Sequence, residues 1–120
     1  MGTIRKFEEL RAWQKARELQ KRIQRIDFGH NFALKDQIQR AVLSITLNIA
    51  EGFGRRSDLE FSQFLNQAHG SVAEVQSALY AARDGHYITE EEFKQMYRES
   101  DDIGKTTYSL CRYLRRWGRK

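Results

Sequence analysis

Basic residues gather in three separate stretches of this chain, and their chemistry suits phosphate groups. They lie near the N-terminus, around residue 55 and along the C-terminal segment: Arg5, Lys6, Arg55, Arg56, Arg112, Arg115, Arg116, Arg119 and Lys120. Arginine forms paired hydrogen bonds with phosphate oxygens, and clustered positive charge releases the counterions that surround a nucleic acid. If the fold brings the three stretches together, they form a binding surface for RNA or DNA that reads charge rather than base sequence.

Two aromatic residues, Tyr113 and Trp117, lie among the C-terminal arginines. Aromatic rings between basic residues can stack on unpaired bases, which would extend the surface to single strands. Trp117 also continues the apolar stripe of its predicted helix, and the arginines there complement the negative end of that helix. We therefore expect Trp117 to complete the core.

Residue patterns for catalysis or metal binding are missing from the sequence. A di-iron bundle needs paired Glu-x-x-His motifs, but Asn66 stands three residues before His69 and Arg83 three residues before His86. There is also no His-x-x-x-His pair, phosphate-binding glycine loop or nucleophile elbow. We expect a non-enzymatic protein that uses no cofactor and no metal.

The single cysteine, Cys111, indicates the compartment of the protein. One cysteine excludes an internal disulfide and a cysteine-based zinc site, which favours a reducing environment. The first residues lack the apolar core of a signal peptide, and every apolar stretch is too short to span a membrane. We expect a cytoplasmic protein without a membrane segment.

A second polar pattern, from Ser44 to Glu74, is expected to be structural. Ser44, Asn48 and Glu51 are spaced i, i+4, i+7, so they share one helix face. Glu51 also stands four residues before Arg55 and can pair with it. We expect Asn48, and on the next helix Ser71 and Glu74, to bridge neighbouring helices and fix their register.

Glycines and a capping motif mark the turn between these two helices. Gly52 and Gly54 are expected to end the first helix, because glycine adopts the left-handed cap conformation at low cost. Ser57 and Glu60 form a capping box that begins the second helix, and Thr89 with Glu92 repeats the pattern further on. Gly70 in mid-helix indicates either close packing by another helix or a neutral surface position.

The elements that position these residues are predicted to be four helices. The chain has 120 residues and no proline, and apolar residues recur every three or four positions. The predicted helices span residues 7–26, 34–51, 57–83 and 90–117, in a single all-α domain over 1–120. Leu43 and Leu47 lie off the apolar stripe of the second helix, which is typical of a helix between neighbours, including subunits.

Short connections favour an antiparallel up-down-up-down four-helix bundle. In that topology the start of the first helix, the turn near residue 55 and the end of the last helix meet at one end, which we call the basic pole. The other end holds Asp84, Glu90, Glu91 and Glu92 and should be acidic or mixed. A formal net charge of +5 is compatible with nucleic-acid binding.

The central segment also resembles a known bacterial family. The residues that carry the resemblance are Ser44-Ile45, Asn48 to Arg55, Ser57, Glu60-Phe61, Phe64-Leu65, Ala68, Gly70-Ser71 and Glu74. Phe7, Leu10, Trp13, Ala16 and Leu19 add to it upstream, as do Leu34, Gln37-Ile38 and Arg40-Ala41. The chain is similar over nearly its whole length to the 23S rRNA-intervening sequence proteins.

The resemblance implies an antiparallel four-helix bundle that assembles into a homopentameric ring. Some members are encoded within insertions in large-subunit ribosomal RNA genes, and similar proteins assist diversity-generating retroelements by binding a reverse transcriptase and its RNA. It implies no catalytic residues. One departure is Thr46, where members usually have proline. Because proline kinks a helix, we expect the second helix to be straighter here.

Two functional hypotheses follow. In the first, an oligomer binds RNA or DNA electrostatically through the basic pole of each copy. In the second, the oligomer is a scaffold for a protein partner such as a reverse transcriptase, and its charge serves steering or solubility.

Overall fold

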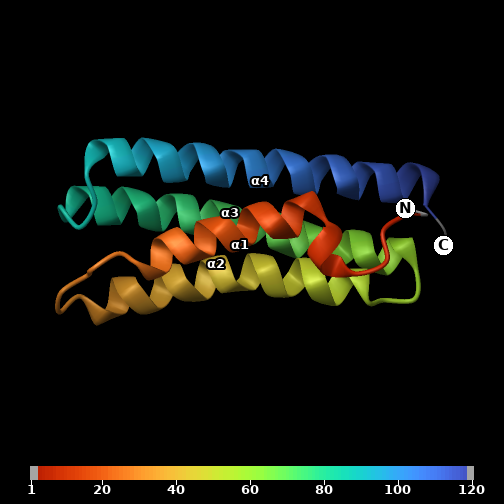
Figure 1. Ribbon diagram of the computed structural model, residues 1–120, viewed down its shortest axis with the longest axis horizontal. Helices are drawn as coiled ribbons and strands as arrows, with labels where there is room; N and C mark the ends of the chain where they lie inside the picture. Colours follow the sequence, from red (N-terminus) through yellow and green to blue (C-terminus); the bar gives the residue numbers. More distant parts are fainter. Residues whose placement is uncertain (1–2, 119–120) are drawn as a thin grey trace.

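The fold is a bundle of four helices, as the sequence predicts. The computed structural model describes residues 3–118, and all regular structure within that range is helical. A short 3₁₀ helix, η1 (Phe7–Glu9), precedes α1 (Arg11–Gln24), α2 (Phe32–Phe53), α3 (Asp58–Asp84) and α4 (Glu90–Trp117). Successive helices run in opposite directions (Figure 1). Arg119 and Lys120 lie outside the described residues.

The first helix is shorter than the predicted span 7–26. The helix is interrupted at Leu10, whose backbone is extended (φ −73°, ψ 128°). This break lets the ring of Phe7 reach that of Trp13, with centroids 5.2 Å apart. Six residues of continuous helix would turn these two side chains well away from each other. Gln14 Nε2 donates to the Glu8 carbonyl at 2.9 Å across the break.

Of the two predicted capping boxes, the one at Thr89 is complete, and the one at Ser57 has only the bond to its hydroxyl. The Ser57 hydroxyl accepts a hydrogen bond from the Glu60 backbone N–H at 3.1 Å, and it lies 3.4 Å from the Glu60 carboxylate. Thr89 and Glu92 form the full reciprocal box, with bonds of 3.0 and 2.8 Å. These caps place the starts of α3 and α4 within one residue of their predicted positions.

The prediction for the two glycines of the α2–α3 turn was wrong in its mechanism. Gly54 caps α2 in a right-handed conformation (φ −79°), and Gly52 lies inside the helix and is buried. A Cβ atom added at Gly52 would lie 2.7 Å from Phe64 Cβ and 2.9 Å from Phe61 Cδ1. Gly52 is therefore required by the close approach of α3, not by a left-handed turn.

A polar network joins α2 to α3 inside an otherwise apolar interface. Ser71 Oγ donates to Ser44 Oγ at 2.8 Å, and Asn48 Nδ2 donates to the Ser44 carbonyl and hydroxyl at 2.8 and 3.0 Å. The predicted bridge therefore exists, but Ser44 makes it instead of Asn48. Glu74 was predicted to share this role; it is exposed and takes no part in the network. Hydrogen bonds between these side chains are directional, so they fix the register of α2 against α3 more narrowly than apolar packing alone would.

The apolar core runs along the whole bundle. Its completely buried members include Leu19, Ile45, Leu65, Leu79 and Ile103. α2 continues without interruption through Thr46, whose hydroxyl donates to the Leu43 carbonyl at 2.9 Å and lies 3.3 Å from Gln20 Oε1. No helix within residues 3–118 is long and apolar enough to cross a membrane.

Candidate nucleic-acid interface

The bundle brings the three basic stretches to one end. Figure 1 shows the N-terminal segment, the α2–α3 connection and the end of α4 at the same pole. All seven described members are exposed: Arg5, Lys6, Arg55, Arg56, Arg112, Arg115 and Arg116. The predicted placement is therefore confirmed for these residues, while Arg119 and Lys120 fall outside the described range. Their role in binding stays a prediction.

Two of the arginines are held in place by neighbouring side chains. Arg55 Nη2 lies 2.7 Å from Glu51 Oε1, and its guanidinium stacks 4.7 Å from the centre of the Phe64 ring. Arg115 Nε donates to Ser62 Oγ of α3 at 3.4 Å. These contacts fix part of the positive surface to the start of α3 and limit the side-chain entropy that phosphate binding would cost.

The charge of the other basic residues at the pole is not neutralised by an ion pair within the described chain. Among the described residues, none of the other five side chains has a carboxylate within ion-pair distance: Arg5, Lys6, Arg56, Arg112 and Arg116. The acidic residues nearby in the chain are Glu8, Glu9, Glu51 and Asp58. Glu51 is already paired with Arg55. Asp102 is the last acidic residue of the sequence, so the charged residues that α4 itself contributes to the pole are all basic. The Asp58 carboxylate of α3 lies beside the end of α4, at Gly118.

The prediction that Trp117 completes the core was wrong. Its side chain is 70% exposed, whereas Leu114, one turn earlier, is 2% exposed. At about 100° per residue, the buried stripe through Cys111 and Leu114 continues at position 118, so Trp117 falls beside it. Position 118 does face α3, because a Cβ added at Gly118 would lie 2.7 Å from Asp58 Cβ. The periodic pattern alone could not separate these two positions at the end of a helix.

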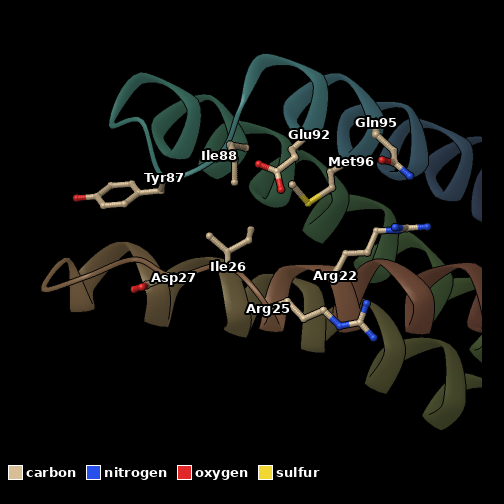
Figure 2. Close-up of a pocket in the computed structure, with 9 residues that line it drawn as sticks. All are labelled: Arg22, Arg25, Ile26, Asp27, Tyr87, Ile88, Glu92, Gln95 and Met96. Atoms are coloured by element: carbon tan, nitrogen blue, oxygen red, sulfur yellow. The ribbon is translucent and has the colours of Figure 1, made fainter.

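The opposite pole is mixed in charge and shallowly hollowed. Arg83 there lies 3.3 Å from Asp84 and 3.9 Å from Glu90, so its charge is locally compensated. A hollow of about 300 Å³ lies between the end of α1 and the start of α4, where Ile26 and Ile88 face each other (Figure 2). Its Glu92 carboxylate already accepts the Thr89 backbone N–H. The Asp27 carboxylate accepts the Gly29 backbone N–H, and Arg22 pairs with Glu99, so these polar side chains have structural partners. We assign the hollow no chemistry.

Side chains with catalytic or metal-binding potential are dispersed. Within residues 3–118, no three His, Cys, Asp or Glu side chains are grouped to hold a metal ion. Cys111 is buried, with Sγ 3.4 Å from the Ser62 carbonyl, and His69 packs beside Tyr108 with ring centroids 6.1 Å apart. Both side chains therefore pack between α3 and α4.

Two titratable groups on α4 have shifted pKa values, and neither lies at the basic pole. The hydrogen bond from Lys15 lowers the pKa of the Asp102 carboxyl, and nearby positive charge adds to the effect. The pKa of Tyr97 is raised by partial burial and by the neighbouring Tyr80. The Lys15–Asp102 pair and the Arg22–Glu99 pair, at 2.8 Å, join α1 to α4.

The fold and its surface define an all-helical four-helix-bundle protein whose positive charge is concentrated at one end. Residues 8–109 match the family model described as 23S rRNA-intervening sequence protein. This match covers most of the chain, so the protein belongs to that family, and the resemblance noted in the sequence is confirmed.

A solved structure supports the same assignment. It is a crystal structure of a protein of unknown function from the S23 ribosomal protein family of Bacteroides thetaiotaomicron VPI-5482. The two chains are 27% identical, with a TM-score of 0.77, over 83% of this chain and 97% of the other. No curated protein matches the chain.

Proposed function

We propose that this protein is a non-enzymatic nucleic-acid-binding protein of the cytoplasm that holds RNA or DNA at its basic pole. The observation that carries the proposal is the concentration of exposed basic side chains at one end; six of the seven described ones form no ion pair with another described residue. Arginine and lysine in such a cluster displace counterions from phosphates, which gives binding that depends strongly on salt. Base sequence contributes little, because phosphate contacts carry no sequence information.

A homopentameric ring is part of the proposal. Leu43 and Leu47 on α2 are 41% and 57% exposed, which supports a face that is covered in an assembly. In a ring, the basic poles of five copies point the same way and bind one nucleic acid at several points. Multivalent contact of this kind raises the overall affinity far above that of a single pole.

The proposal is tested with two variants of equal charge. In the pole variant, four unpaired basic residues are changed to Gln: Lys6, Arg56, Arg112 and Arg116. In the control variant, four exposed basic residues outside the pole are changed to Gln: Arg25, Lys35, Lys94 and Arg98. Each variant lowers the formal net charge of +5 by four, so overall charge cannot explain a difference between them.

Fluorescence anisotropy with a labelled RNA, over a series of salt concentrations, is the measurement. We expect the native chain and the control variant to bind with similar steep salt slopes. The pole variant should bind more weakly, and its slope should be smaller by roughly 0.7 to 0.9 for each phosphate that it no longer neutralises. Equal weakening of the two variants, or no RNA binding by the native chain at low salt, would contradict the proposal.

A second candidate function is a scaffold for a protein partner such as a reverse transcriptase. The exposed apolar side chains of α2, which include Phe32 at 66% exposure, favour this candidate. Affinity capture after nuclease treatment separates the two functions. Recovery of one defined protein that no longer binds when Leu43 and Leu47 are changed to Ser supports the scaffold, whereas recovery of nucleic acid alone argues against it.

A further inference from the structure

We propose that the basic pole selects unpaired strands, with a base stacked on the indole ring of Trp117. This inference rests on the proposed function and names the form of nucleic acid that the pole binds. Its ligand is a single-stranded RNA or DNA segment, with phosphates on the arginines and one base on the ring. It assigns to Trp117 a binding role that follows from its position at the surface.

Trp117 is exposed to solvent and is surrounded by basic residues. Its side chain is 70% exposed, and the guanidinium of Arg116 lies 5.4 Å from the centre of its ring. Tyr113, one turn earlier on the same face of α4, is 47% exposed. The two rings together form one exposed aromatic surface, and the charge around it is complementary to a polyanion.

The shortness of α1 leaves this face of α4 uncovered. α1 has 14 residues and α4 has 28, and the ion pairs Arg22–Glu99 and Lys15–Asp102 fix α1 beside the first half of α4. Figure 1 shows α4 extending past the start of α1. In the described chain, η1 packs against α1 and α2 instead of filling the remaining space. Tyr113 and Trp117 therefore form a shelf beyond the reach of α1.

Stacking on this shelf discriminates between strands. In a duplex, both faces of each internal base are already covered by neighbouring base pairs, and only the phosphates are accessible to the pole. An unpaired base can turn out of the strand and present a face to the indole, while Arg116 contacts the adjacent phosphate. Single strands therefore make both interactions with the pole, and duplexes make only the electrostatic one.

The experiment compares Trp117→Ala and Trp117→Phe with the native chain. The probes are labelled oligouridine, oligothymidine and an RNA duplex of matched length, in anisotropy titrations at low salt. Native protein should prefer the two single strands. Trp117→Ala should bind them about tenfold more weakly, with duplex binding unchanged, and Trp117→Phe should retain most of the preference. Equal weakening for oligouridine and oligothymidine shows that stacking does not require the ribose hydroxyl.

Intrinsic fluorescence reports the stacking directly. In a Trp13→Phe background, Trp117 is the remaining tryptophan of the chain, and its emission should be quenched by oligouridine but not by the duplex. Quenching that follows protein concentration without nucleic acid would show that a second copy covers the ring, and would overturn the inference. So would unchanged single-strand affinity in Trp117→Ala. If the native chain binds single strands and duplexes equally, the electrostatic function stands and the stacking inference fails; if it binds neither, both fail.

Discussion

Replacing Gly52 with alanine tests how tightly α2 and α3 meet beside the turn that carries Arg55 and Arg56. The added methyl group would lie 2.7 Å from Phe64 Cβ and 2.9 Å from Phe61 Cδ1. Carbon atoms in contact prefer about 3.5 to 4.0 Å, so α3 must shift or remain compressed. Overpacking of this kind lowers the free energy of unfolding by roughly 1 to 3 kcal/mol. The higher helix propensity of alanine offsets at most about 1 kcal/mol of that loss.

Gly70→Ala is the matched control in the same bundle. Gly70 is exposed in mid-helix, and an added Cβ there meets no atom within 4 Å. Helix propensity alone should therefore stabilise this variant by about 1 kcal/mol. The free energies of unfolding of the two variants should differ by roughly 1 to 3 kcal/mol, which is the overpacking cost itself.

Urea unfolding followed by helical circular dichroism, at two protein concentrations, measures the difference. The two concentrations separate folding of the bundle from dissociation of an assembly. Gly52→Ala as stable as Gly70→Ala would refute the close α2–α3 approach. A destabilised Gly70→Ala would instead show that another surface packs on that face of α3.

Three further substitutions have defined outcomes in the same unfolding assay. Asp102→Asn should lower the free energy of unfolding by less than about 1 kcal/mol near pH 7, because the ion pair with Lys15 is exposed. The pKa of Asp102 in the folded protein lies below the ordinary 3.8, so this difference between the variant and the native chain should vanish as the pH falls through the lowered pKa. Ser71→Ala should cost about 1 kcal/mol through loss of the hydrogen bond to Ser44, whereas the exposed Ser77→Ala should stay within about 0.5 kcal/mol; equal effects would contradict the bridge. Trp117→Ala should be nearly neutral, whereas a core tryptophan would cost about 3 to 5 kcal/mol.

The helical elements follow from local chemistry and were therefore predictable. α4 begins at Glu90, as predicted, because Thr89 and Glu92 form a capping box whose two hydrogen bonds join residues only three positions apart. The break at Leu10 was not predictable in the same way, since it depends on the contact between Phe7 and Trp13. Gly52 was recognised as significant for the wrong reason, because the side chains that crowd it belong to α3.

The location of the candidate site could be predicted from the sequence, but the side-chain contacts and exposures that shape its surface could not. Topology alone put the basic stretches at one pole, and the i, i+4 spacing indicated the Glu51–Arg55 pair. The contact of Arg115 with Ser62 crosses from α4 to α3, and periodicity contains no signal for it. The exposure of Trp117 depends on how far α4 extends beyond α1, which is a property of the assembled bundle.

Crosslinking of RNA to the protein tests the basic pole most directly. A photoreactive oligouridine is bound to the full chain, irradiated and mapped by mass spectrometry. We predict crosslinks in the segments 53–58 and 108–118, competed away by salt and by unlabelled RNA. Crosslinks concentrated at the other end of the bundle, around residues 84–90, or spread evenly over the surface would contradict the assignment of the basic pole as the nucleic-acid interface.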